Sequence, residues 1–218
     1  MKSECRFIRA RQPEQKEQRR TQILESAAFL LERDGFEKVS LNGIARHTNV
    51  AKSNIYRYFE SREDIFLQLL QQDWVDWLDD LETAIEPLKG SDDIEQVARL
   101  LTDKVAAAPR MCQLISVLAS VLEHNLSEDL LFQFKMESMQ LGMRLLGTIH
   151  AALPGMNQEN LLPAVQSIIA LIAGLWPLGN PNPMVEKVMN RPELRAFKIE
   201  FYDALEQSIR LMIKGAYS

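Results

Sequence analysis

The sequence contains few of the residues that build disulfide frameworks and metal sites. Its 218 residues include two cysteines, Cys5 and Cys112, and three histidines. Two cysteines are typical of a reducing compartment, and nothing requires them to pair. His47, His124 and His150 lack ligand spacing with one another or with cysteine. The sequence therefore predicts no metal site and no cofactor.

Signals for membrane insertion and secretion are also missing. We expect no apolar run of the ~18–20 residues that a membrane span needs. The N-terminal stretch, MKSECRFIRARQPEQKEQRR, has no apolar signal core. These absences predict a cytoplasmic protein without membrane contact.

Strand patterns and enzyme motifs are absent as well. No stretch alternates apolar and polar residues with a period of two, so we expect no sheet. No Gly-rich phosphate loop, nucleophile elbow or paired-carboxylate constellation stands out. The expected fold is all-α and the expected function is not enzymatic, although an all-helical enzyme, recognisable by turnover, stays open as an alternative.

Two short helical segments with a break between them occupy residues 40–59, which read SLNGIARHTNVAKSNIYRYF. Leu41, Ile44 and Ala45 have the i, i+3, i+4 spacing of one buried helix face. Ser40 precedes them as an N-cap that can accept a hydrogen bond from a free backbone amide. In the break, Asn49 tolerates the left-handed backbone that a tight turn needs. The pattern predicts two helices joined by a short turn.

The second of these helices has a polar and basic outer face. Ile55 and Phe59 lie one turn apart and are predicted to anchor it to the core. The remaining side chains suit contact with nucleic acid: Lys52, Ser53, Asn54, Tyr56, Arg57 and Tyr58. This is the layout of a helix-turn-helix, whose second helix lies in the DNA major groove. A helical hairpin with a merely solvated outer face is the alternative, and the N-cap and composition favour DNA.

The charge is divided unevenly along the chain. The net charge is -5, yet residues 1–60 hold twelve basic and eight acidic residues, whereas residues 61–218 hold thirteen basic and twenty-two acidic residues. A basic N-terminal part can meet phosphates, and an acidic remainder stays off the DNA.

From about Arg20 to Leu70 the sequence resembles the TetR-type one-component transcriptional regulators. The resemblance rests on TQILESAAFLLERDGFEKVS, on the helix-turn-helix, and on the tail YRYFESREDIF. Asn49 stands where the family usually has a turn glycine, and Ala51 stands where it often has a capping serine. Gly43 is also a less usual choice within its helix.

This resemblance implies roles for individual residues in a complex with DNA. It assigns base contacts to Asn42, Lys52, Ser53 and Asn54. It assigns phosphate contacts to Ser40, Tyr56, Arg57 and Arg62. The partner that these roles imply is a palindromic double-stranded operator, which would associate the protein with the nucleoid while it is bound.

Three parts follow from these patterns: a flexible basic arm at residues 1–13, a helix-turn-helix DNA-binding domain at residues 14–60, and a helical effector-binding and dimerisation domain at residues 61–218. Arg6, Arg9 and Arg11 fit either a merely flexible terminus or contacts with the DNA backbone and minor groove.

Helical periodicity continues to residue 214. Ser61 gives a capping-box-like start to a long connecting helix, which Pro87 and Gly90 end. Including the two short helices, about nine are expected, which the resemblance implies as well. The other seven span 14–34, 61–88, 92–107, 109–124, 128–153, 158–176 and 193–214, with the loop PLGNPNP before the last.

The last two expected helices carry more apolar surface than one small bundle can easily bury. Such surface usually marks a partner, most commonly a second copy. A helix-turn-helix protein also needs two heads to bind a palindrome. We therefore expect a homodimer through these two helices, with an interface formed by Ile168, Leu171, Leu175, Phe197, Phe201 and Leu205.

A second group of residues is a candidate for a small-molecule pocket in the C-terminal domain. Methionines and tryptophans adapt to apolar ligands, but they also simply fill cores. The candidates are Trp74, Met111, His124, Met136, Met139, Met143 and Trp176, with Trp77 and His150 on the same helices. We expect a hydrophobic or aromatic effector.

These observations combine into one functional hypothesis, a repressor that an effector releases from its operator. The alternative is a DNA-bound interaction protein on the same scaffold, which recruits a protein partner and has no small-molecule effector.

Overall fold

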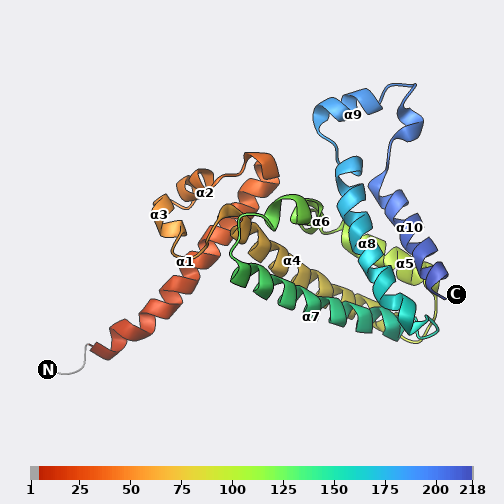
Figure 1. Cartoon of the computed structure of the whole chain (residues 1–218), viewed down its shortest axis with the longest axis horizontal. Coiled ribbons are helices and arrows are strands. Elements are labelled where there is room, and N and C mark those ends of the chain that lie inside the picture. The colour runs from red at the N-terminus through yellow and green to blue at the C-terminus, as the bar shows by residue number, and fades with distance from the viewer. Residues whose placement is uncertain (1–4, 218) are drawn as a thin grey trace.

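The computed structural model describes the backbone of residues 5–217 and the side chains of residues 14–217. Within this range the chain forms ten α-helices and four short helical turns, and no strand. The expected all-α fold is therefore confirmed. Figure 1 shows an N-terminal group of helices at one end of a long bundle.

The first helix, α1 (Cys5–Asp34), begins earlier than expected. The sequence predicted a flexible arm at residues 1–13 and a helix from residue 14. The backbone is instead already helical from residue 5 and remains so through Pro13. Ile23, Ala27 and Leu31 lie on its buried face. The alternatives for Arg6, Arg9 and Arg11, and any role for Cys5, concern side chains outside the described residues.

The predicted helix-turn-helix pair consists of α2 (Leu41–His47) and α3 (Lys52–Ile55), which follow the turn η1 (Phe36–Lys38). Gly35 ends α1 with φ 79°, a left-handed conformation that favours glycine. α1 packs against α2 and α4, so the three N-terminal helices share a core with the long connecting helix.

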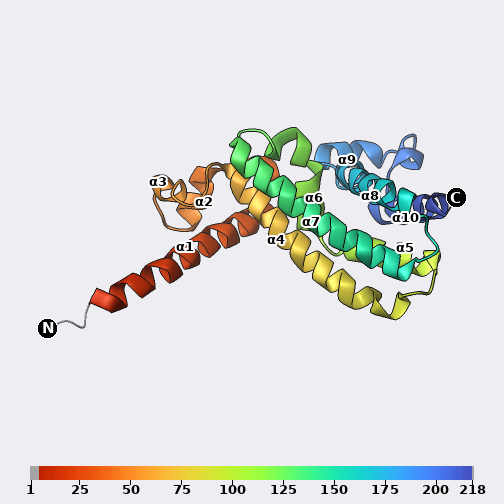
Figure 2. The same cartoon turned by 60° about the horizontal axis from the view of Figure 1, so that its bottom comes forward.

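Helix α4 (Arg62–Ile85) connects this N-terminal group to the bundle. Its 24 residues give it a length of roughly 36 Å at 1.5 Å per residue. The Ser61 hydroxyl accepts a hydrogen bond from Asp64 N at 3.1 Å and caps its first turn, as predicted. The turn η2 (Glu86–Leu88) follows directly. Figure 2 shows α4 running beneath the bundle alongside α7.

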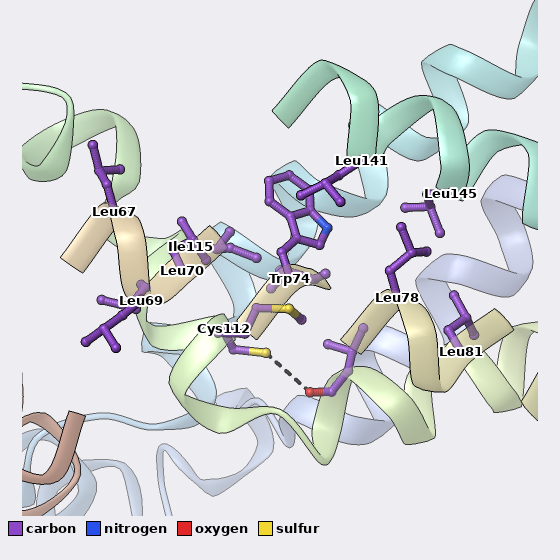
Figure 3. Close-up of a cluster of buried hydrophobic side chains, with 14 of the residues drawn as sticks. Leu67, Leu69, Leu70, Trp74, Leu78, Leu81, Cys112, Ile115, Leu141 and Leu145 are labelled. Carbon is purple, nitrogen blue, oxygen red and sulfur yellow. Dashed lines mark hydrogen bonds between the residues drawn. The ribbon is translucent and has the colours of Figure 1, made fainter. Parts of the chain in front are cut away.

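The bundle behind α4 contains α5 (Ile94–Ala106), α6 (Pro109–Ser116), η3 (Leu118–Leu122), α7 (Glu128–Ala152), α8 (Gln158–Gly179) and α10 (Phe201–Ala216). α10 packs against α5 and α8, α6 packs against α8, and α4 packs against α5, α6 and α7. Figure 3 shows Trp74 and Leu78 of α4 facing Leu141 and Leu145 of α7.

Two of the expected helices are divided differently. The helix expected at 109–124 ends at Ser116 and continues as the π-type turn η3. The helix expected at 193–214 begins only at Phe201, because residues 180–200 form the short helix α9 (Pro183–Met189) and the turn η4 (Arg195–Phe197). Asn182 caps α9, and Pro183 occupies its first turn, where a missing amide hydrogen costs nothing.

Helix α8 contradicts the expectation that no segment is long and apolar enough to span a membrane. Its most apolar 18-residue window has a mean hydropathy of 1.8, and only 17% of that window is buried. Pro163, Gln166 and Ser167 interrupt the run of apolar residues in the sequence, but they leave the average hydropathy of the window high. Length and composition alone do not distinguish such a helix from one that packs against protein.

The buried face of α4 makes a first prediction. Leu78 is completely buried, so Leu78→Ala should lower the free energy of unfolding by about 2–5 kcal/mol through lost apolar contact and a cavity. Met143→Ala, at a side chain that is 63% exposed on α7, is the matched control and should change it little. Urea denaturation monitored by circular dichroism measures both. Equal effects of the two substitutions would contradict the assignment of α4 to the core.

Candidate nucleic-acid interface and effector cavity

The turn between α2 and α3 is built from local hydrogen bonds. Ser40 Oγ accepts from Gly43 N at 3.1 Å, and Thr48 Oγ1 donates to Ile44 O at 2.7 Å. Asn49 has φ 54°, the left-handed conformation that the sequence predicted for this position. Val50 N then donates to Ala45 O at 3.0 Å and closes the turn. These bonds fix the angle at which α3 leaves α2.

Buried residues of α3 and the turn after it hold the outer face toward solvent. Ile55 and Phe59 are 0% and 2% exposed. The polar side chains before and after Ile55 are exposed, as expected: Lys52, Ser53, Asn54, Tyr56 and Arg57. Ser40 and Asn42, at the start of the neighbouring helix α2, are also exposed. The predicted contact residues other than Arg62 thus lie on one accessible surface.

A shallow depression on this surface includes one residue that the sequence analysis missed. Asn42, Arg46, Asn49 and Lys52 line it with neighbouring backbone, and Arg46 is exposed on α2. Its position between two predicted base-contact residues makes Arg46 a further candidate for DNA contact. The i, i+4 spacing of Asn42 and Arg46 was the signal that could have revealed it.

Arg62 makes internal contacts and does not face the depression. Its guanidinium donates to Val39 O at 3.0 Å, pairs with Glu63 at 3.1 Å and lies 4.8 Å from the centre of the Phe36 ring. These contacts tie the start of α4 to the η1 turn. The geometry contradicts the expectation that Arg62 is available to a phosphate.

A small apolar cavity lies where α4, α5, α6, α7 and α8 meet. Its volume is about 30 Å³, comparable to one water molecule, so the helices are nearly closed on it. Every lining side chain is apolar or aromatic: Trp74, Trp77, Leu101, Val105, Met111, Ile115, Leu145, Ile149, Val165, Ile168, Ile169 and Ile172. The indole Nε1 of Trp77 is buried and has no hydrogen-bond partner.

An open cleft of about 360 Å³ adjoins the cavity and shares Trp77 and Met111 with it. Four carboxylates line this cleft: Glu32, Asp73, Asp76 and Asp80. Lys104 pairs with Asp80 at 2.7 Å, and Arg110 pairs with Glu32 at 3.0 Å and with Asp73. The arrangement offers an apolar interior next to a polar mouth.

Of the predicted pocket residues, Trp74 and Met111 line the cavity, as does Trp77. The three α7 methionines do not: Met136, Met139 and Met143 are 39%, 54% and 63% exposed. Their i, i+3, i+7 spacing is that of one helix face, but Leu141, Leu145 and Ile149 occupy the face that turns inward. Periodicity finds a face without deciding which side is inside.

Two further pocket predictions are wrong in the described structure. His124 is exposed in the turn before α7. Trp176 packs edge-on against Phe201, with ring centroids 5.1 Å apart, and does not line the cavity. His150 also lies outside the cavity, where its Nε2 is 3.5 Å from Gln158 Nε2.

The predicted dimer residues occupy three different environments. Leu205 is fully buried within the protomer, and Ile168 lines the cavity, so both serve the single chain. Leu171, Leu175 and Phe201 are half-buried on α8 and α10. Phe197 is 75% exposed in η4, not in the last helix as expected.

Two sequence-family models match the chain, and the boundary between their matches lies in the first part of α4. The model described as bacterial regulatory proteins of the tetR family matches residues 23–69, and the model described as a tetracyclin repressor-like C-terminal domain matches residues 71–218. The chain belongs to the TetR family. The second model alone covers more than half of its length.

Individual relatives of this TetR-family chain are distant. It is 23% identical over 133 residues to the fatty acid metabolism regulator protein of Bacillus subtilis, covering 60% of each chain. It is 27% identical over 73 residues to the uncharacterised HTH-type regulator YfiR of the same organism, covering 34% of this chain and 36% of that one. The chain thus spans less than two thirds of either curated relative.

Solved structures share the fold over nearly the whole chain. FadR from Bacillus halodurans has a TM-score of 0.56 at 17% identity, with 89% of this chain and 98% of that chain covered. FadR from Bacillus subtilis, solved with stearoyl-CoA, gives the same values. A TetR-family regulator from Streptomyces coelicolor has a TM-score of 0.56 at 14% identity over 91% and 99% of the two chains.

Side-chain contacts join the TetR-type head to the bundle at three places. Glu60 accepts from Ser127 N at 3.2 Å and from its hydroxyl at 3.0 Å. Arg110 of α6 bridges Asp73 of α4 and Glu32 of α1. Arg20 of α1 donates to Gln68 of α4. These contacts connect α1 directly to α4 and α6.

Cys112 lies beside the cavity and makes a second prediction. Its thiol is buried, donates to Val105 O at 3.4 Å (Figure 3), and burial raises its pKa to about 12. In a Cys5→Ser background we expect almost no reaction with a thiol reagent at pH 8, because the thiolate is scarce and access is blocked. Labelling rates with and without urea measure this. Rapid labelling in native buffer would be inconsistent with the packing of α6.

Proposed function

We propose that this TetR-family protein is a dimeric, sequence-specific DNA-binding regulator that a small apolar effector releases from a palindromic operator. The observation that carries the proposal is the exposed polar face of α3, held outward by the buried Ile55 and Phe59. A rigid, capped helix pair with this face suits major-groove binding.

The proposed division of labour on DNA follows side-chain chemistry. Amide, amine and hydroxyl groups that can read base edges belong to Asn42, Lys52, Ser53 and Asn54. Groups that can meet phosphates belong to Ser40, Tyr56 and Arg57. We add Arg46 to the second set because its exposed guanidinium suits a phosphate and it lines the depression with Asn42 and Lys52. We leave out Arg62 because its guanidinium has internal partners.

The effector site proposed is the cavity beside Trp74 and Trp77. Its all-apolar lining favours a hydrophobic ligand, and its volume of about 30 Å³ means that a ligand must part the helices to enter. FadR of Bacillus subtilis has been solved with stearoyl-CoA, which supports a long acyl chain as the first ligand class to test.

Release follows from the position of α4 between ligand and DNA. A ligand that separates α4 from α6 would strain the Arg110 bridge to Asp73 and Glu32, and would shift α1 with it. The ligand must favour the state that does not bind DNA, and a difference of roughly 3 kcal/mol changes occupancy about 100-fold. Two heads that lose their spacing then lose the operator.

Dimerisation through α8 and α10 is part of the proposal. It is supported by the window of α8 that is apolar but only 17% buried, and by the half-buried Leu171, Leu175 and Phe201. We place the working protein in the cytoplasm, where operator DNA is available.

One observation supports the alternative of an interaction protein. α7 presents an exposed apolar row of Phe132, Met136, Met139 and Met143, which a protein partner could cover. Under this alternative, operator binding would not respond to any small molecule. The ligand experiment below separates the two functions.

The DNA roles make a third prediction. Tyr56→Phe should weaken binding to all sequences alike, by about tenfold, because a phosphate contact carries no base information. Asn54→Ala should change the preferred sequence, since a good base contact contributes about 1–3 kcal/mol of discrimination. Selection of bound genomic fragments gives the operator, and binding to single-base variants of it tests both substitutions. A changed base preference in Tyr56→Phe would refute this division of roles.

The cavity makes a fourth prediction. Fatty acids and acyl-CoAs of increasing chain length should change tryptophan fluorescence through Trp74 and Trp77, and should release the operator over the same concentration range. Val165→Phe adds a larger side chain than the cavity can hold, so it should abolish the fluorescence response and should itself weaken operator binding, as the ligand does.

The control for this experiment is Val75→Phe, at a side chain that is 37% exposed on the outer side of α4. It should bind and respond like the wild type. Operator binding that no ligand changes would instead favour the interaction protein.

A further inference from the structure

The segment between α8 and α10 is built as a projecting arm. We call residues 180–200 the α9 arm; it contains α9 and η4. Figure 1 shows it standing beyond the ends of α8 and α10, away from the rest of the bundle. Neither α9 nor η4 packs extensively against another helix of the described chain.

At the base of the α9 arm, the end of α8 and the start of α10 lie very close together. A Cβ on Gly179 would lie 2.7 Å from Cβ of Phe201, so only glycine allows α8 and α10 to approach this closely. The ring centroids of Trp176 and Phe201 are 5.1 Å apart, and Asn180 Nδ2 donates a hydrogen bond to Trp176 O at 3.0 Å. These contacts set the direction in which the arm leaves the bundle.

The α9 arm also has local structure of its own. Asn182 Oδ1 accepts from Met184 N at 3.0 Å and from Val185 N at 3.1 Å, which caps α9. Pro181 and Pro183 restrict the backbone on either side of this cap. A capped, proline-flanked helix on a fixed root loses less conformational freedom on binding than a free loop.

Large apolar side chains on the α9 arm lie in solvent. Met184 and Phe197 are 70% and 75% exposed, and Val185 and Val188 are 44% and 37% exposed. Contiguous exposed apolar surface on a structured element marks an interaction site. The arm therefore has the properties of a binding element.

A second copy of the chain is the occupant that the surroundings favour. Large apolar side chains are also exposed on the two helices that the arm connects: Leu178 of α8 at 57%, and Tyr202 and Leu211 of α10 at 39% and 59%. These are the helices through which we propose that the protein dimerises. In a two-fold dimer through α8 and α10, an element that extends beyond the ends of these helices lies close to the other subunit, and both arms do so equivalently.

Charge supports the same occupant. The arm holds four basic residues and three acidic ones, whereas residues 61–218 as a whole hold thirteen basic and twenty-two acidic residues. A slightly basic arm is attracted to the acidic body of another copy.

We propose that the α9 arm of each subunit packs across the partner subunit, with Met184 and Phe197 as its main contacts. The arm thereby extends the dimer beyond the α8 and α10 helices. This inference rests on the proposed dimer and adds a distinct contact to it.

The first test measures dimer dissociation by sedimentation equilibrium of the full chain. Phe197→Asp and Met184→Asp should each raise the dissociation constant at least about tenfold, because a charge replaces a buried apolar contact. Phe132→Asp is the matched control, since Phe132 is 66% exposed on α7, and it should change the constant less than about twofold. Circular dichroism establishes that all three variants are folded.

The second test identifies the surface that the arm touches. The photo-crosslinking residue p-benzoylphenylalanine replaces Phe197, and ¹⁵N-labelled and unlabelled copies are mixed, dissociated and re-associated. We expect cross-linked peptide pairs that combine one heavy and one light peptide, together with a product of twice the 25.0 kDa chain mass. If the two peptides of every cross-linked pair carried the same label, the cross-link would lie within one subunit, and the proposal would be overturned.

The outcomes separate this inference from the proposed dimer. If the wild type is dimeric and Phe197→Asp dissociates no more readily than Phe132→Asp, the arm does not contribute and the inference fails alone. If the wild type is monomeric at all accessible concentrations, the proposed dimer and the arm contact both fail.

Discussion

The buried face of α4 is the constraint on which the rest of this structure depends. From Ile65 and Phe66 at its start to Leu81 and Ile85 at its end, its inward side chains are completely buried. The first of these pack with the DNA-binding helices and the last with the bundle. No part of α4 can move without disturbing one of the two cores, because protein interiors are close-packed and respond to small displacements.

The position of α4 explains how the proposed regulation would work. Trp74 and Trp77 line the cavity near the middle of α4, and Asp73 accepts the Arg110 bridge one turn away. A cavity of about 30 Å³ is too small to accept a ligand without movement, so binding and helix displacement are the same event. In the proposed mechanism, the ion pairs at the cleft, rather than flexible loops, connect this displacement of α4 to α1.

Parts of the chain whose structure is set by near neighbours in sequence were predictable. Ser40 caps α2, Asn49 takes a left-handed turn, and Ile55 lies inside, as the sequence indicated. The start of α4 at Ser61 was predicted for the same reason. Caps and turns depend on side chains three or four residues away, which a sequence displays directly.

Predictions that required knowledge of long-range packing were mixed. The α7 methionines have the spacing of a core face but lie outside, because Leu141 and Leu145 compete for the inside and pack against α4 (Figure 3). Arg62 looked free for phosphate until the fold brought Val39 and Phe36 next to it. Periodicity, capping and charge by themselves indicated the helical class and the helix-turn-helix pair, and the resemblance over residues 20–70 indicated the family. The tertiary structure alone decided which apolar faces enclose the cavity and which, on α8, α10 and the α9 arm, remain exposed, because burial depends on neighbours that only folding brings together.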